Sequence, residues 1–297
     1  MKKSHALLAA CLLTLCAHAA PAPAQQKNSR RAPADVVVAD PTVFAPAERA
    51  KPARAPQRAK AGRRAAAASP AAETDAQVER IFQRFLEAQG GRAAMAAVKT
   101  RVMRGTATHS QSNLPGSLEY YSKAPDKTLT LVALPGGQQF IQAYDGRSDW
   151  MSNPLTGTVA LNGALVIFDR GSDFGRMPKA SEMYSSVAYK GTARVGGREA
   201  HVVAAVRRGE MMQMLYFDTS TGLLVRCAVA VFDHVAQGKV QIVVNYGDYA
   251  KVDGVMIPTT FEHVFPDYTL TFKIYEIKHN VHIDDSMFER PAARAGN

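Results

Sequence analysis

Apolar residues at helical spacing define the first element that the pattern predicts. From Glu73 onward an apolar stripe runs between charged residues, Gly90-Gly91 ends the helix, and a short second turn follows over 93–98. A helix with one apolar stripe is buried against another element, so we expect it to dock on a sheet. The stripe is formed by Ile81, Phe82, Phe85 and Leu86.

Beyond residue 100 the pattern alternates between apolar and polar positions, with turn residues between the runs. In 239–248, one face carries valine, isoleucine and tyrosine, and the other carries lysine, glutamine and asparagine. One buried and one solvated face is typical of an antiparallel sheet. The predicted strands are 100–109, 117–123, 127–134, 138–145, 148–151, 185–195, 199–206, 211–218, 223–232, 239–248, 255–265 and 269–278.

Two matching hairpin phrases organise the C-terminal half of this sheet. Residues 216–226 and 249–258 each run from an apolar strand into an Asp-led turn, in which Gly222 and Gly254 take the positions that need a positive φ. We therefore predict a mainly β (α+β) fold. It consists of one curved antiparallel sheet of about eleven strands, an incomplete barrel with the helix on its concave face.

The segment 157–178 breaks the strand rhythm. Leu161, Leu165 and Phe168 lie at helical spacing within it, which predicts a short lid-like helix inserted between strands on the concave face. Space that the helices leave unfilled inside the curved sheet would form an apolar cavity.

The N-terminus has the pattern of a secretory signal peptide over residues 1–24. Two lysines precede an apolar stretch, 6–16, that is too short to span a bilayer, and small residues over 22–24 place cleavage before Gln25. We therefore expect export to the periplasm or cell envelope. Lipidation is the alternative, because the Leu-Ala-Ala-Cys sequence that ends at Cys11 is similar to a lipobox.

Basic charge is concentrated in the Ala/Pro-rich segment 25–72. Of the formal net charge of +10, two come from Lys2 and Lys3 and seven from this segment, so residues 73–297 carry about +1. We expect the segment to be a disordered linker, because it has too little apolar surface to fold. It is either a solvated spacer or an attachment to an anionic envelope surface. The near-neutral domain 73–297 argues against nucleic-acid binding.

Cysteine usage excludes a disulfide within the mature chain. Of three cysteines, Cys11 and Cys16 fall in the signal peptide, and Cys227 remains alone on one face of a predicted strand. A buried apolar role suits Cys227 better than that of a reactive thiol. The sequence has no Cys-x-x-Cys-His motif, and we predict no haem and no other cofactor.

The best candidate for metal binding is 279–285, which contains two histidines and two aspartates. On a strand His279 and His282 point to opposite faces, so a structural role is favoured and we predict no metal site.

Other acidic residues lie at turns. Asp145, Asp218 and Asp253 belong to Gly-containing turns, where hydrogen bonds within the turn explain their carboxylates. The sequence contains no Gly-x-Ser-x-Gly, P-loop or His-Glu-x-x-His motif, and we predict a non-enzymatic protein.

Strand parity and position suggest which side chains line the cavity. Methionine adapts to irregular ligands, although the methionines near 212 fill an ordinary core equally well. Trp150, the only tryptophan, either lines the cavity or anchors the sheet, and Phe140 and Tyr144 present the same alternatives. The predicted cavity residues are Phe140, Tyr144, Trp150, Leu165, Phe168, Met212 and Met214.

Five sequence phrases carry a family resemblance. They are Phe-Leu-Glu-Ala-Gln-Gly-Gly-Arg at 85–92, Val-Gly-Gly-Arg-Glu-Ala at 195–200, Phe-Asp-Thr-Ser-Thr-Gly-Leu-Leu at 217–224, Val-Asp-Gly-Val-Met-Ile-Pro at 252–258, and Lys-His-Asn-Val at 278–281 with the residues up to Phe288. With them, residues 76–291 resemble exported bacterial domains of the outer-membrane lipoprotein carrier and receptor (LolA/LolB-like) superfamily. The resemblance implies an incomplete β-barrel with a helical lid around an apolar cavity for lipid or acyl chains. None of the family's functional residues matches a single position here.

These observations favour an envelope protein that binds a hydrophobic or amphipathic ligand, such as a lipid or a lipoprotein acyl chain, without catalysing a reaction. The alternative is a periplasmic sensor or adaptor whose half-barrel recognises another envelope protein. An enzyme whose residues are distant in sequence is the third class.

Overall fold

The computed structural model describes residues 70–111, 115–154, 157–160, 184–207, 212–233 and 238–291. The predicted signal peptide and all of the linker up to residue 69 lie outside these ranges, as do Leu165 and Phe168. Among the described residues, no helix is both long enough and apolar enough to cross a membrane.

Two helices precede the sheet, as the apolar stripe predicted. Helix α2 (Pro70–Ala88) and helix α3 (Gly91–Ala97) are separated by Gln89 and Gly90, and Gly90 has a φ of 113°. A Cβ atom at Gly90 would lie 2.1 Å from the carbonyl oxygen of Gly254, so the backbone of the helix junction approaches the sheet too closely for any side chain.

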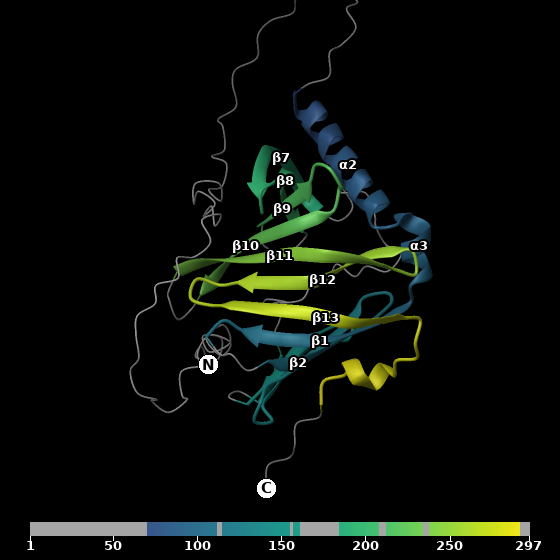
Figure 1. The fold of residues 1–297 in the computed structure, drawn as a ribbon, viewed down its shortest axis with the longest axis vertical. Helices are drawn as coiled ribbons and strands as arrows, with labels where there is room; N and C mark the ends of the chain where they lie inside the picture. The colour runs from purple at the N-terminus through teal and green to yellow at the C-terminus, as the bar shows by residue number, and fades with distance from the viewer. Residues whose placement is uncertain are drawn as a thin grey trace, which may run out of the picture.

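Thirteen strands follow within the described residues and form one antiparallel sheet (Figure 1). The prediction of a mainly β, open curved sheet is confirmed, and the sheet is wider than the eleven strands expected. The strands are β1 (Thr100–His109), β2 (Gly116–Lys123), β3 (Lys127–Ala133), β4 (Gln139–Tyr144), β5 (Asp149–Asn153), β6 (Gly157–Ala160), β7 (Tyr184–Val195), β8 (Arg198–Arg207), β9 (Met212–Asp218), β10 (Leu224–Asp233), β11 (Gly238–Val252), β12 (Val255–Val264) and β13 (Thr269–His279).

The chain enters this sheet near its middle. From β1 it meanders outward to the edge strand β6, and from the opposite edge strand β7 it meanders back until β13 pairs with β1. The segment predicted to be a lid-like helix begins differently, because 157–160 forms β6 and pairs with β5. The remainder of that segment lies outside the described residues.

Both predicted hairpin turns form as expected. Gly222 and Gly254 have φ values of 78° and 82°, and Asp253 precedes the second glycine with a φ of 47°. Since Val252 pairs directly with Val255, Asp253-Gly254 is a two-residue turn of the kind that matches strand twist.

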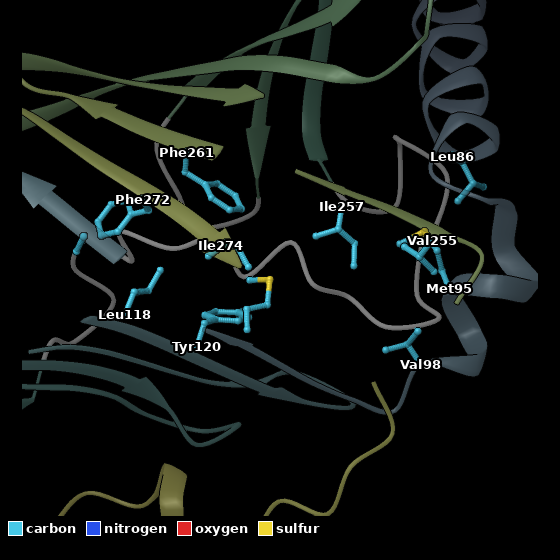
Figure 2. Packing of buried hydrophobic residues seen from close by; sticks show 12 residues of the cluster. Leu86, Met95, Val98, Leu118, Tyr120, Val255, Ile257, Phe261, Phe272 and Ile274 are labelled. Atoms are coloured by element: carbon cyan, nitrogen blue, oxygen red, sulfur yellow. The ribbon is translucent and has the colours of Figure 1, made fainter. Parts of the chain in front are cut away.

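The helices cover one face of the sheet, here called the helix face. Ile81 and Phe85 of α2 pack against Leu215 and Phe217, while α3 packs against the start of β12. Figure 2 shows the second of these clusters, in which Leu118 and Tyr120 lie across from Phe272 and Ile274. The apolar core of the helix face therefore extends from β8 across to β2.

A C-terminal segment covers part of the other side, here called the opposite face. Ile283 and Phe288 pack against Val102, Leu129 and Trp150. The segment ends in the short 3-10 turn η2 (Asp285–Phe288), which is capped by the carboxylate of Asp284 accepting a hydrogen bond from the N–H of Ser286.

Candidate functional site

A row of polar side chains crosses the helix face at one end of the sheet. Neighbouring strands bring them into register, since each residue is the direct partner of the next and therefore shares its face. Most of them are buried, with Arg101 9% and Ser122 1% exposed. The polar row consists of His279, Arg101, Ser122, Thr128, Tyr144 and Asp149.

Arg101 is held by a hydrogen-bonded chain that begins at the surface. Its Nε donates to Nε2 of His279 at 3.0 Å, and Nδ1 of His279 lies 3.0 Å from Oδ2 of Asp253. Because Nε2 accepts, the imidazole is neutral and carries its proton on Nδ1, which donates to Asp253. The carboxylate therefore orients the ring, and the ring orients the guanidinium.

The electrostatics of this chain agree with that assignment. Burial, reinforced by the charge of Arg101, lowers the pKa of His279, and the hydrogen bond with Asp253 opposes this effect only in part. Burial also lowers the pKa of Arg101 to about 10, with Tyr120 acting in the other direction. At neutral pH the row thus presents a charged guanidinium beside a neutral imidazole.

Ser122 lies directly opposite Arg101 in the ladder. Its Oγ is buried and has no hydrogen-bond partner among the described residues. A hydroxyl in this condition is uncommon in a folded protein and calls for an explanation.

The polar row borders an apolar surface on the same face. Met103 follows Arg101 by two residues in β1, and Tyr120 precedes Ser122 by two residues in the antiparallel β2. Both therefore lie next to the polar row on the helix face. Next come Leu118 and Ala107, which are also buried. At about 3.3 Å per residue, this surface extends roughly 20 Å from Arg101 to Ala107.

At the other end of the helix face, aromatic rings pack beneath α2. The ring of Phe82 lies 5.6 Å from that of Tyr184 and 5.3 Å from that of Phe217, and Phe85 lies 5.2 Å from Phe217. These contacts hold the helix to the strands. The role of this end is structural.

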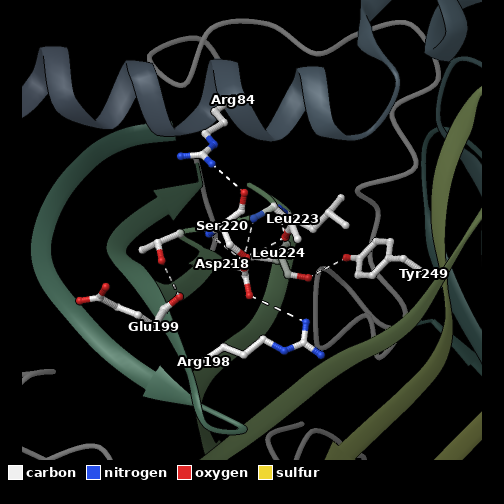
Figure 3. Close-up of polar contacts among 10 residues, drawn as sticks. Arg84, Arg198, Glu199, Asp218, Ser220, Leu223, Leu224 and Tyr249 are labelled. Carbon is white, nitrogen blue, oxygen red and sulfur yellow. Dashed lines mark hydrogen bonds and ion pairs between the residues drawn. The ribbon is translucent and has the colours of Figure 1, made fainter.

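The turn after β9 is organised by Asp218 and is tied to α2 by Arg84 (Figure 3). Oδ1 of Asp218 accepts hydrogen bonds from the backbone N–H groups of Ser220 (2.9 Å) and Thr221 (2.8 Å), and Arg84 of α2 donates to the carbonyl of Ser220 at 2.8 Å. Arg198 lies 3.9 Å from the other carboxylate oxygen. Asp218 therefore has the turn role that the sequence predicted.

The other two turn aspartates differ from each other. Asp145 accepts from the N–H groups of Arg147 and Ser148, as predicted. The carboxylate of Asp253 instead bonds to His279, because the tight β11–β12 turn projects it toward the end of β13.

The structural interpretation of 279–285 agrees with these contacts. Both ring nitrogens of His279 are hydrogen-bonded, Asp284 caps η2, and Asp285 pairs with Lys123 (2.7 Å) and Lys127 (3.0 Å). No three His, Cys, Asp or Glu side chains within the described ranges are grouped to hold a metal ion.

The predicted cavity residues are divided between the two faces. Phe140 and Tyr144 lie on the helix face, opposite Val132 and Thr128. Trp150 is on the opposite face, packed against the C-terminal segment. Met212 and Met214 are on the opposite face as well. Cys227 is half-buried on the helix face.

Sequence reasoning missed Arg101, Ser122 and His279 as a group. One signal was present: Arg101 shares strand parity with Met103, Gly105 and Ala107, so it is a cation in an otherwise apolar set. Its pairing with His279 depends on β13 lying beside β1, which no local pattern indicates.

The protein belongs to the class of mainly β folds with one open, curved antiparallel sheet and helices on one face. On that face a polar row lies beside an apolar core. No family model matches the chain, and no curated protein matches it in sequence. Its fold is similar to several solved structures.

One is a DUF1329 family protein from Desulfovibrio piger (14% identity, 71% of this chain and 97% of that chain covered, TM-score 0.48). A second is a putative outer membrane lipoprotein-sorting protein domain from Vibrio parahaemolyticus (10% identity, 72% and 97% covered, TM-score 0.47). A third is a LolA superfamily protein from Nitrosomonas europaea (14% identity, 73% and 98% covered, TM-score 0.46). These structures include the superfamily that the sequence phrases resemble, and at such identities the likeness concerns the fold.

Proposed function

We propose that this protein binds a hydrophobic or amphipathic ligand, such as a lipid or a lipoprotein acyl chain, on its helix face and catalyses no reaction on it. One observation carries the proposal: a buried polar row and a buried apolar surface adjoin on the same face. An amphipathic molecule has the same division, and each methylene removed from water stabilises the complex by about 0.8 kcal/mol. Phe140 and Tyr144 belong to the proposed binding face.

Mass spectrometry of lipids that co-purify with the full chain tests this proposal. We expect a lipid in stoichiometric amount, and we expect the delipidated protein to bind a fluorescent fatty-acid probe. A protein that purifies without lipid and does not bind the probe would refute ligand binding.

We also propose that the chain is exported, with residues 1–24 removed and the basic segment 25–72 contacting an anionic envelope surface. Fractionation of cells and N-terminal sequencing of the mature chain test this. Cytoplasmic retention with Met1 intact would contradict it.

A role as sensor or adaptor is the second candidate, and the edge strand β7 favours it. This twelve-residue strand lies at one edge of the described sheet, so its outer side offers backbone groups to a partner strand. Partner capture in a pull-down that persists after the helix face is saturated with lipid would support the adaptor role.

A further inference from the structure

We propose that Arg101 and Ser122 form a binding subsite for an anionic head group, a carboxylate or a phosphate, of an amphiphile whose chain lies along Tyr120 and Leu118. This inference rests on the proposed function and specifies its ligand.

The two side chains are placed to act on one group. Arg101 and Ser122 are direct partners in the β1–β2 ladder, so their side chains leave the same face side by side. Ser122 Oγ is 1% exposed and has no hydrogen-bond partner among the described residues. A carboxylate or phosphate oxygen bound beside Arg101 would accept the hydrogen bond that this hydroxyl can donate.

The guanidinium is oriented before any ligand arrives. Its Nε is engaged by His279, whose ring is set by Asp253, so the planar fork has a defined direction. Planar bidentate donors suit carboxylate and phosphate groups, and a charge in a buried position attracts an anion more strongly than one in water.

The apolar surface begins at the subsite. Met103 and Tyr120 are the next residues on the same face, and Leu118 and Ala107 follow. An amphiphile with its head at Arg101 would thus place its chain against buried apolar side chains. A free anion would use none of this surface, and a neutral amphiphile would use only this surface.

Binding of four probes to the delipidated full chain separates these cases: dodecanoate, dodecyl phosphate, 1-dodecanol and inorganic phosphate, each measured by calorimetry. We expect the two anionic amphiphiles to bind at least about tenfold more tightly than dodecanol, as a charge-assisted hydrogen bond implies. Inorganic phosphate should bind far more weakly than dodecyl phosphate.

Ser122→Ala is the decisive variant, with Ser117→Ala as its matched control. Ser117 is an exposed serine on the other side of the same strand. Ser122→Ala should lose most of the preference for anionic heads, leave dodecanol affinity unchanged and keep the urea midpoint, since the hydroxyl it removes has no described partner. Arg101→Gln should abolish the preference, while Arg104→Gln, in the same strand on the opposite face, should retain it.

The outcomes separate the subsite from the proposed function. Equal affinity for dodecanol and the anions, or full anion preference in Ser122→Ala, would overturn the subsite while ligand binding stands. Inorganic phosphate binding as tightly as dodecyl phosphate would overturn the amphiphile assignment. Absence of binding by every amphiphile would overturn both proposals.

Discussion

The indole nitrogen of Trp150 donates a hydrogen bond to the carbonyl oxygen of Phe288 at 2.8 Å. The bond joins β5 to the C-terminal segment on the opposite face, and the Phe288 side chain beside it is fully buried. Lys123 adds a hydrogen bond to the carbonyl of Ile283 and an ion pair with Asp285. The C-terminal segment is therefore part of the core around β1–β5.

Phe288→Ala should destabilise the protein by roughly 3–5 kcal/mol, because it empties a fully buried aromatic site. Trp150 is the only tryptophan, so its emission reports this region alone, and it should shift to longer wavelength as water reaches the indole. Urea unfolding followed by fluorescence measures both effects. Met287→Ala, at a neighbouring exposed position, is the control and should change stability by less than about 0.5 kcal/mol. Equal effects of the two substitutions would show that the segment is not a packed element.

Strand parity predicts which side chains share a face of the sheet, but not which face the helices cover. Alternation correctly indicates that Phe140 and Tyr144 share a face, and it predicts nearly every strand boundary within two residues. It does not indicate which face the helices cover. That choice depends on α2 docking over β7–β9, a contact between segments distant in sequence.

The polar row could not be predicted from local sequence patterns for the same reason. Arg101 and Ser122 are neighbours through a hairpin, and so could have been paired, but His279 joins them only because the last strand closes beside the first. The short strand β6 was missed because four residues, 157–160, are too few to establish an alternation beside apolar residues at helical spacing.

Gly90→Ala should destabilise the fold by more than about 3 kcal/mol. The new Cβ would lie 2.1 Å from the carbonyl oxygen of Gly254, and backbone on both sides prevents relief. The adjacent Gly91 is a matched control, since it also has a positive φ, 82°, but no atom within 4 Å of its added Cβ. Gly91→Ala should therefore cost only the backbone strain, about 1–2 kcal/mol. Thermal or urea unfolding of both variants provides the measurement, and similar losses would contradict the close contact.

Asp218→Ala should cost roughly 2–3 kcal/mol, because it removes a buried carboxylate that accepts hydrogen bonds from the N–H groups of Ser220 and Thr221. Burial alone would raise the pKa of Asp218, but these hydrogen bonds outweigh it and lower the pKa. A lowered carboxyl pKa stabilises the fold at pH values above the ordinary pKa of 3.8. This stabilisation is lost as the pH falls through the folded-state pKa.

The difference in stability between the wild type and Asp218→Ala should therefore be constant from pH 7 to 5 and shrink below about pH 4. Asp145→Ala, which removes a similar but more exposed turn carboxylate, should cost less, about 1 kcal/mol. A larger loss of stability in Asp145→Ala than in Asp218→Ala would contradict the inference that the buried Asp218 carboxylate stabilises the fold more.

His263 makes the helix face sensitive to acid. It is 2% exposed, lies opposite Val244 and Leu270, and its ring is 5.1 Å from that of Phe272. Burial lowers its pKa from 6.5 to about 4. Between these values the unfolded chain binds a proton that the folded chain excludes, so stability falls as the pH drops from about 6.5 to about 4. The total loss is roughly 3 kcal/mol.

His263→Phe keeps a ring at this position and removes the titration, so it should be markedly less sensitive to acid. Urea unfolding at pH 7 and pH 4.5 should show the wild type losing roughly 2–3 kcal/mol more than the variant. His109 and His279, whose pKa values burial also lowers, remain in both proteins and cancel in this difference. His282→Gln, a substitution at an exposed histidine, serves as the control. Equal acid sensitivity in the wild type and His263→Phe would mean that the buried imidazole accepts its proton without unfolding the sheet around it.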